Sequence, residues 1–293
     1  MDIILTGASG FLGNSIYKLL FEENIITLGR YNADIICDLS NTIPKLITAD
    51  IVVHSAGKAH SIPKTDSQKQ DFFDVNVNGT INLLKGLEQS TVVPKAFVFI
   101  SSVAVYGLSQ GVQINEQAFL SATDPYGQSK IQAEQIVQEW CHKNNVTCTI
   151  LRLPLLVGPN PPGNLGAMIK GIKKGYYFNI GGGGAKKSMV MAEDVAKILL
   201  IASKTGGIYN LTDGYHPSMI ELSAHISKRL KKRGSLNVPE WMAVFAAKFG
   251  DLIGNRSPIN SHILLKIKAN LTFDDSKARK ALGWKPNRVL DVF

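Results

Sequence analysis

The stretch Thr6-Gly7-Ala8-Ser9-Gly10-Phe11-Leu12-Gly13 decides how this chain begins to fold. It follows the apolar run Ile3-Ile4-Leu5, which predicts a buried strand, and its glycines recur at every third position. Glycines at this spacing allow a sharp turn, a close approach of the backbone to a phosphate, and tight packing of the next helix. The helix N-terminus then stabilises the anion. The stretch alone fits either a plain tight turn or the pyrophosphate site of a dinucleotide.

Apolar runs alternate with segments of helical periodicity over the first half of the chain. Runs rich in Ile, Val, Thr and Phe predict strands at 2–7, 24–29, 50–57, 95–102 and 147–154. This alternation predicts an α/β Rossmann fold, a doubly wound parallel sheet with helices on both faces. The position after the first strand therefore favours the dinucleotide site over a plain turn. We assign the cofactor to Gly7, Ser9, Gly10, Phe11, Leu12 and Gly13.

The pattern changes after Leu156, where loops and helices dominate and one more strand is expected within 207–214. This change predicts a smaller, mostly helical substrate domain on the carboxyl ends of the strands, where open α/β sheets bind ligands. The predicted division is residues 1–157, with a return segment at about 188–214, for the dinucleotide-binding domain, and 158–187 and 215–293 for the substrate domain.

Composition excludes several classes of protein. With 293 residues, 45 % of them hydrophobic, the chain can bury a large core, and no run of eighteen apolar residues predicts a membrane span. Three cysteines without metal spacing and an acidic N-terminus favour a reduced, cytoplasmic protein with no metal. The net charge of +9 is mostly scattered, so we expect an anionic small-molecule substrate rather than nucleic acid. We interpret the apolar segment 241–254 as a core or substrate-domain helix rather than a membrane-surface helix, because it is too short to span a bilayer.

The end of the second strand bears on the choice of dinucleotide. NAD-binding folds usually place a carboxylate there for the ribose hydroxyls, whereas NADP-binding folds often place an arginine. This chain has Arg30 and no carboxylate at that point, which favours NADP(H) and leaves NAD(H) possible. Asp38 and Leu39 follow one element later and are candidates for the adenine side, although Asp38 also fits a plain turn residue.

Tyr126 and Lys130 form the candidate catalytic pair. Side chains four residues apart lie on one face of a helix. An ammonium near a phenol lowers the phenol pKa toward the working range of an acid or base. Ser101 and Ser102 end the strand at 95–102 and place a hydroxyl opposite that phenol. A Tyr-x-x-x-Lys spacing is common by chance, but this order of elements is not.

Together these features resemble the extended short-chain dehydrogenase/reductase family of nucleotide-sugar epimerases, dehydratases and reductases. The matching stretches span nearly the whole chain and include TGASGFLG, HSAG, FISSVAVYG, DPYGQSK, LRLPLLVGP, YNLTDG and SKARKALGWKP. The resemblance implies that Tyr126 is the proton donor and acceptor, Lys130 its partner and Ser102 the ligand of the substrate hydroxyl. It also implies that Ala56, Gly57 and Pro154 lie along the cofactor, as do Tyr126 and Lys130, whose ammonium can hold a ribose hydroxyl. Asn76 is expected near it too, or as a buried structural residue.

Departures from the family pattern narrow the expected function. Pro154 stands near an expected asparagine, and Lys187 stands where the family has a phosphate-binding arginine. These features are similar to bacterial reductases of UDP-4-keto-6-deoxy-N-acetylhexosamines, which serve surface polysaccharide synthesis. The alternatives are an NAD-dependent nucleotide-sugar 4-epimerase and a nonenzymatic dinucleotide-sensing regulator. For a UDP-sugar substrate the candidate ligands are Ser102, Asn164, Lys187 and Arg256, and the resemblance also implies a homodimer.

Overall fold

A seven-stranded parallel sheet is the centre of the protein. The computed structural model describes residues 1–59, 61–253 and 260–293, and in this part of the chain the strand order is β11-β7-β5-β4-β1-β2-β3. The strands are β1 (Asp2–Thr6), β2 (Asn24–Gly29), β3 (Ile35–Ile36), β4 (Ile51–His54), β5 (Ala96–Ser102), β7 (Thr147–Leu153) and β11 (Gly207–Asn210). All five predicted early strands and the later one lie in this sheet, which confirms the doubly wound α/β fold.

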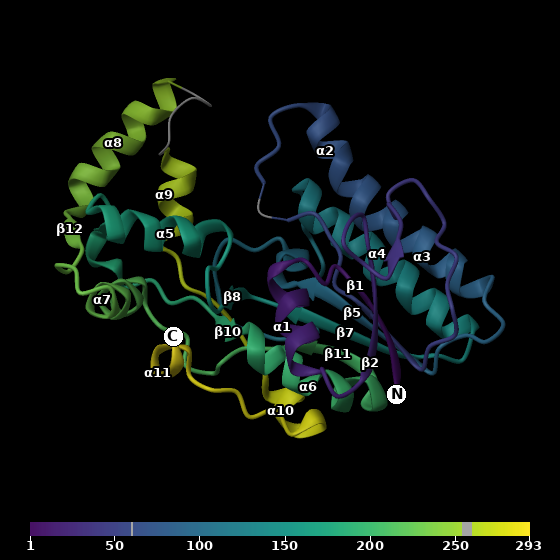
Figure 1. Cartoon of the computed structure of the whole chain (residues 1–293). Coiled ribbons are helices and arrows are strands. Elements are labelled where there is room, and N and C mark those ends of the chain that lie inside the picture. Colours follow the sequence, from purple (N-terminus) through teal and green to yellow (C-terminus); the bar gives the residue numbers. More distant parts are fainter. Residues whose placement is uncertain (60, 254–259) are drawn as a thin grey trace.

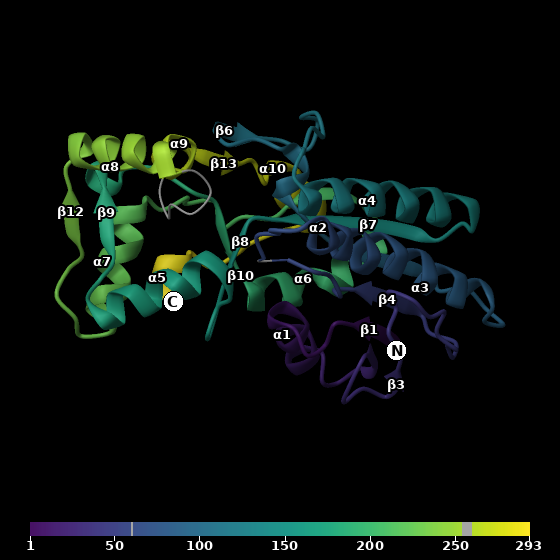
Figure 2. The same cartoon turned by 90° about the horizontal axis from the view of Figure 1, so that it is seen from above.

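Helices cover both faces of the sheet (Figures 1 and 2). One face packs against α1 (Phe11–Leu19), α6 (Ala192–Thr205) and α10 (Ser276–Leu282). The other packs against α3 (Gly79–Glu88) and α4 (Pro125–Lys143), and α2 (Asp66–Phe73) lies against α4. Both strand faces are therefore buried, which explains why the strands read as continuous apolar runs rather than as alternating patterns.

The second part of the chain holds more strands than its sequence pattern predicts. Its helices are α5 (Gly163–Lys174), α7 (Met219–Arg229), α8 (Glu240–Ile253), α9 (Ser261–Lys268) and α11 (Val289–Val292). Short parallel pairs join β8 (Leu155–Val157) to β10 (Met189–Met191), β9 (Phe178–Ile180) to β12 (Leu236–Val238), and β6 (Gly111–Ile114) to β13 (Leu271–Phe273). The expectation of a single strand there is wrong, because runs of three or four residues are too short to show a periodicity.

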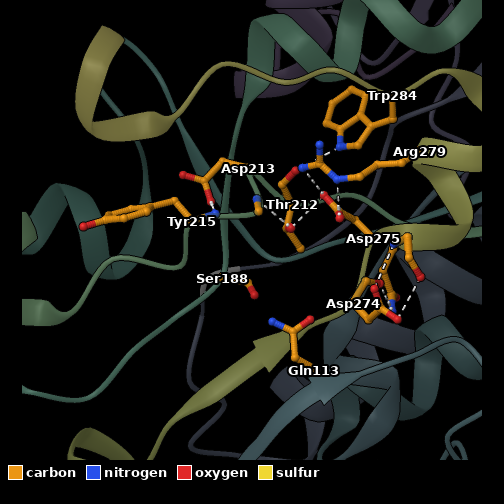
Figure 3. A network of polar contacts seen from close by, with 12 residues as sticks. Gln113, Ser188, Thr212, Asp213, Tyr215, Asp274, Asp275, Arg279 and Trp284 are labelled. Atoms are coloured by element: carbon orange, nitrogen blue, oxygen red, sulfur yellow. Dashed lines mark hydrogen bonds and ion pairs between the residues drawn. The ribbon is translucent and has the colours of Figure 1, made fainter.

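A polar network ties the last residues of the chain to the end of β11 (Figure 3). The Thr212 hydroxyl donates to Asp275, which also receives two hydrogen bonds from Arg279. The Trp284 indole donates to the Thr212 carbonyl at 2.9 Å, and the Val289 N–H donates to Asp213. Residues 275–284 thus pack with the core of the central sheet, although they follow the substrate-domain helices in sequence. The division into two domains stays a prediction.

Candidate active site

The glycine turn after β1 has the geometry that a bound diphosphate needs. Gly7 has a φ of +72°, which strains any side chain, and a Cβ on Gly13 would lie 2.0 Å from the Gly7 carbonyl oxygen. Glycine at both positions therefore lets α1 begin directly against the turn. The N-cap residue of α1 is Gly10, with no side-chain cap, and the first turn carries no acidic residue. Its first N–H groups are left for an anion.

A pocket of about 510 Å³ borders this helix end. Its lining comes from α1, the loop after β8 and the start of α6, and it includes Ser9, Gly10, Phe11, Gly158, Asn160 and Ala192. Leu12 and Gly13 face inward and are buried. The uncapped start of α1 and the turn that requires glycine at position 7 fit the pyrophosphate of a dinucleotide. The residues predicted for this part of the cofactor lie together at this turn.

The end of β2 matches its predicted geometry only in part. Arg30 follows β2 directly and is exposed. Asp34, the next carboxylate, instead accepts hydrogen bonds from the Thr27 N–H at 2.8 Å and from the Thr27 hydroxyl at 2.7 Å, which hold its pKa below the usual range. Asp38 accepts from the Ser40 N–H as a turn residue does, and Leu39 is buried in the core. Arg30 thus remains the candidate for the cofactor ribose.

A buried histidine links the glycine turn to the loop after β4. Thr6 Oγ1 accepts the Ala56 N–H at 3.0 Å and lies 2.7 Å from His54 Nδ1. On the other side, His54 Nε2 lies 3.0 Å from the Thr80 hydroxyl, which donates onward to the Asn76 carbonyl. Because the Thr80 hydroxyl donates its hydrogen to the Asn76 carbonyl, it can only accept from His54. The imidazole therefore carries its proton on Nε2, and its Nδ1 accepts from the Thr6 hydroxyl.

The neutral imidazole predicts a pH dependence of stability. Burial, with a smaller contribution from Lys130, lowers the pKa of His54 from 6.5 to about 3. Between these values the unfolded chain binds one more proton than the folded chain, so the free energy of unfolding falls as the pH falls. From pH 7 to pH 5 we expect a loss of about 2 kcal/mol from this residue, measured by urea unfolding.

The test compares slopes rather than absolute stabilities. His54→Gln keeps a polar side chain but removes the titration, so its loss between pH 7 and pH 5 is expected to be about 2 kcal/mol smaller than in the unchanged protein. His142→Gln, at an exposed position, serves as the control and keeps the original slope. Equal slopes in all three proteins would contradict a neutral buried His54.

Asn76 holds the loop that carries Gly57. It lies in the π-helical turn η1 (Asp74–Asn78) between α2 and α3 and is buried. Its Oδ1 accepts from the Lys58 N–H at 2.7 Å, while its Nδ2 donates to the Lys58 carbonyl and to Ser129 Oγ. Asn76 is therefore the buried structural residue that was the alternative expectation. Any effect it has on a cofactor would act through the position of the loop that carries Gly57.

The candidate catalytic side chains meet where β5 ends and α4 begins. Ser102 is the last residue of β5, and its Oγ accepts the Ala104 N–H at 3.2 Å. Tyr126 is in the first turn of α4, with its ring centroid 6.1 Å from that of Phe72, and the Ser102 hydroxyl is near enough to the phenol to lower its pKa. Lys130 lies one turn along the same helix. Tyr126 and Ser102 thus face one another as predicted.

Lys130 is buried below the Gly57 loop. Its Nζ donates to the Ile100 carbonyl at 2.8 Å and lies 4.5 Å from the centroid of the Phe99 ring. A Cβ on Gly57 would come within 3.3 Å of the same Nζ. Only glycine at position 57 therefore leaves the space beside the ammonium open, and the predicted cofactor residues Ala56 and Gly57 adjoin the catalytic lysine.

The ionisation of this pair differs from the expectation. Burial lowers the pKa of Lys130 to about 8, an effect that Glu134 partly opposes. Burial raises the pKa of Tyr126, opposed by the hydrogen bond from Ser102. The predicted lowering of the phenol pKa by the ammonium is therefore not present in the chain alone, where the loss of hydration raises that pKa.

A buried ion pair behind the site was not predicted from the sequence. Arg152 on β7 donates from Nη2 to Glu134 Oε2 at 2.7 Å and from Nε to both carboxylate oxygens. Ser101 also donates to Glu134, and Tyr106 accepts from Arg152. The available signal was an arginine inside the apolar run at 147–154, since a buried guanidinium requires a partner.

The predicted substrate residues are less closely grouped. Lys187 Nζ donates to the carbonyls of Lys266 and Ala269, at the C-terminal end of α9, and burial lowers its pKa. This ammonium thus has structural partners, and its role toward a phosphate stays a prediction. Asn164 is exposed in the first turn of α5, and Pro154 is half-buried between β7 and β8. Arg256 lies outside the described residues.

Comparison with known families decides where the chain belongs. The family model described as "NAD dependent epimerase/dehydratase family" matches residues 3–212, which include the glycine turn and Ser102, Tyr126 and Lys130. The chain belongs to the NAD dependent epimerase/dehydratase family. It is therefore a member of an enzyme family that uses a nicotinamide dinucleotide and acts on nucleotide sugars.

Similar proteins agree with this assignment. The chain is 26 % identical to a UDP-glucose 4-epimerase of Vibrio cholerae over 99 % of this chain and 92 % of that protein. It is 27 % identical to an N-acetyl-alpha-D-glucosaminyl-diphospho-ditrans,octacis-undecaprenol 4-epimerase of Escherichia coli O157:H7, over 96 % and 89 %. In fold it resembles MoeE5 in complex with UDP-glucose and NAD, with a TM-score of 0.75, 18 % identity, and coverage of 98 % and 94 %.

Proposed function

We propose that this protein is a nucleotide-sugar 4-epimerase that uses a retained nicotinamide dinucleotide. The observation that carries the proposal is the meeting of Ser102 and Tyr126 at the carboxyl end of β5, with Lys130 one helical turn further along α4. The uncapped start of α1 lies at the same edge of the sheet, after β1. Both full-length relatives named above are 4-epimerases, which favours this reading over the reductase expected from the sequence.

The residues divide the chemistry between them. The start of α1 would hold the pyrophosphate, and Gly57 leaves room beside Lys130 for a ribose. A bound nicotinamide would supply reversible oxidation at the sugar C4. The Tyr126 phenol exchanges the proton of the C4 oxygen, while Ser102 donates a hydrogen bond to that oxygen and orients it. Lys130, held by the Ile100 carbonyl, keeps its ammonium beside the site, where it would hold the ribose of the cofactor.

The substrate class is a UDP-linked hexose or N-acetylhexosamine. The Vibrio cholerae relative is a UDP-glucose 4-epimerase, and MoeE5 binds UDP-glucose. The Escherichia coli relative is named for an N-acetylglucosaminyl diphosphate attached to undecaprenol. A diphosphate is common to these compounds, and the net charge of +9 fits such an anionic ligand.

A second candidate is the NADPH-dependent reduction of a UDP-4-keto-6-deoxy-N-acetylhexosamine, and the end of β2 supports it. Arg30 is exposed there, and the nearest following carboxylate, Asp34, is held by Thr27. A cationic side chain without a competing acid favours a 2′-phosphate and hence NADP(H). Because reductases consume their cofactor and epimerases regenerate it, cofactor consumption distinguishes the two functions.

The experiment measures both activities on one preparation. The purified protein is first denatured, and any released dinucleotide is identified as NAD(H) or NADP(H). UDP-glucose, UDP-N-acetylglucosamine and the undecaprenyl-diphosphate sugar are then incubated with the protein, and the C4 epimers are quantified by proton NMR. In parallel, the 4-keto-6-deoxy sugar is mixed with NADPH or NADH and the absorbance of the reduced nicotinamide is followed.

Epimer formation without net cofactor consumption would support the proposal. Stoichiometric loss of NADPH with the keto sugar, and no epimer from the other substrates, would replace it with the reductase. If dinucleotide binds but neither reaction proceeds, the epimerase proposal fails and a sensing role on the same fold takes its place.

A further inference from the structure

Helix α8 buries its small residues and exposes its large apolar ones, which is the reverse of an ordinary surface helix. Its small residues Ala243 and Ala247 are buried against α9. Its large apolar residues point outward: Trp241 is 72 % exposed, Phe245 74 % and Leu252 84 %. A helix normally buries its largest apolar side chains in the core. Packing within the part of the chain that the structure describes therefore does not explain the outward face of α8.

The exposed residues form one continuous stripe. At about 100° per residue, positions 241, 245, 249 and 252 fall within roughly a quarter of the helix circumference, on the side opposite Ala243 and Ala247. Lys248 lies at the edge of the stripe and is exposed, and together with Trp241 and Phe245 it lines a shallow surface hollow. Figures 1 and 2 place α8 at the end of the molecule remote from the central sheet.

The sequence on either side of α8 carries a surplus of positive charge. Residues 228–270 contain nine lysines and arginines and two acidic residues. Both acids are engaged within the chain: Glu240 pairs with Lys268, and Asp251 accepts from the Ser261 N–H at 3.0 Å. The stripe therefore combines exposed aromatic side chains with Lys248 at its edge, and the segments that flank α8 in sequence add further cations.

This combination fits an anionic lipid surface better than a second copy of the chain. In a two-fold dimer the same patch meets itself, so the surplus of positive charge would face its own copy. An interfacial helix instead places Trp, Phe and Leu among the lipid headgroups while lysines reach the anionic phosphates. None of the helices in the described ranges is long and apolar enough to cross a bilayer.

We propose that the outward face of α8, formed by Trp241, Phe245, Phe249 and Leu252 with Lys248, docks the protein on the surface of an anionic membrane. This is surface docking of one helix rather than a membrane span. It is independent of which sugar the active site converts. It also revises the reading of segment 241–254 as an ordinary substrate-domain helix.

The experiment measures binding of the full chain to vesicles of phosphatidylethanolamine and phosphatidylglycerol, with phosphatidylcholine vesicles for comparison. Sedimentation gives the bound fraction. Intrinsic fluorescence gives the depth of burial, since Trp140 and Trp284 are buried and Trp241 is the exposed tryptophan. We expect sedimentation with the anionic vesicles, a blue-shifted emission, and partial release by high salt.

Matched variants assign the binding to the stripe. The double variant Phe245→Ser, Leu252→Ser is expected to bind at least about tenfold more weakly, because each side chain loses its burial in lipid. The control is Phe119→Ser with Ile62→Ser, since Phe119 is 92 % exposed on a loop elsewhere and Ile62 is similarly exposed. Lys248→Glu is expected to weaken binding to the anionic vesicles only, whereas Lys204→Glu at the end of α6 leaves it unchanged.

Three results would overturn the proposal. The first is no binding to the anionic vesicles. The second is an equal loss in the stripe variant and its control. The third is a concentration-dependent dimer that the stripe variant abolishes while vesicle binding persists. That result would mean that the outward face of α8 is an interface between two copies of the chain. All variants are compared for dinucleotide binding, so a loss of fold is not mistaken for a loss of docking.

Discussion

Replacing Tyr126 by phenylalanine is expected to lower turnover about a thousandfold or more while leaving dinucleotide binding nearly unchanged. The substitution removes one hydroxyl, which faces Ser102, and keeps the ring that lies 6.1 Å from Phe72. Neither of the two neighbouring candidates replaces it: the Lys130 ammonium is bonded to the Ile100 carbonyl, and Ser102 is a poor base without a proton acceptor of its own. The loss should therefore appear in kcat rather than in substrate affinity.

The measurement pairs C4-epimer formation by NMR with a dinucleotide titration of the same variant. Tyr17→Phe on α1, where the ring is half-exposed, is the control for removing a tyrosine hydroxyl, and its activity is expected to stay unchanged. Full activity in Tyr126→Phe would remove the proposed mechanism. Loss of dinucleotide binding together with activity would instead assign Tyr126 to the cofactor.

The part of the fold that follows from the sequence is the part fixed by local rules. Continuous apolar runs buried on both faces predict the parallel strands, and the spacing of Gly7, Gly10 and Gly13 predicts the turn into α1. The placement of Tyr126, Lys130 and Ser102 together also follows, because each lies at the end of an element on one edge of the sheet. The order of elements alone was enough for these predictions.

Long-range packing accounts for what the sequence did not predict. The motifs YNLTDG and SKARKALGWKP support the family resemblance, but neither reveals that Thr212 and Asp275 bond to each other and place α10 on the central sheet. The partners of Lys187 were not predictable for the same reason, because the carbonyl groups that it binds belong to residues 266 and 269, far along the chain. Burial likewise reverses the expected direction of the Tyr126 pKa shift.

Replacing Glu134 by glutamine is expected to lower the free energy of unfolding by about 3–5 kcal/mol. Glu134 and Arg152 are both almost fully buried, and the carboxylate accepts from Arg152 and from Ser101. Glutamine keeps the volume but leaves the guanidinium as an unpaired charge in the core, which is the costly outcome for a buried ion pair. Urea unfolding measures the loss.

Two further variants test whether the loss comes from the unpaired buried charge or from a general sensitivity of the protein to mutation. Glu193→Gln removes the partner of Lys197 in an ion pair whose two side chains are about half-exposed, and it is expected to cost at most about 1 kcal/mol. Combining Glu134→Met with Arg152→Met removes both buried charges and should recover part of the stability that Glu134→Gln loses, because no orphan charge remains. If Glu134→Gln costs no more than Glu193→Gln, the buried pair does not contribute the expected stability. The double variant could also prove less stable than Glu134→Gln. In that case the hydrogen bonds of Glu134 with Ser101 and of Arg152 with Tyr106, rather than the charge pairing, would account for the stabilisation.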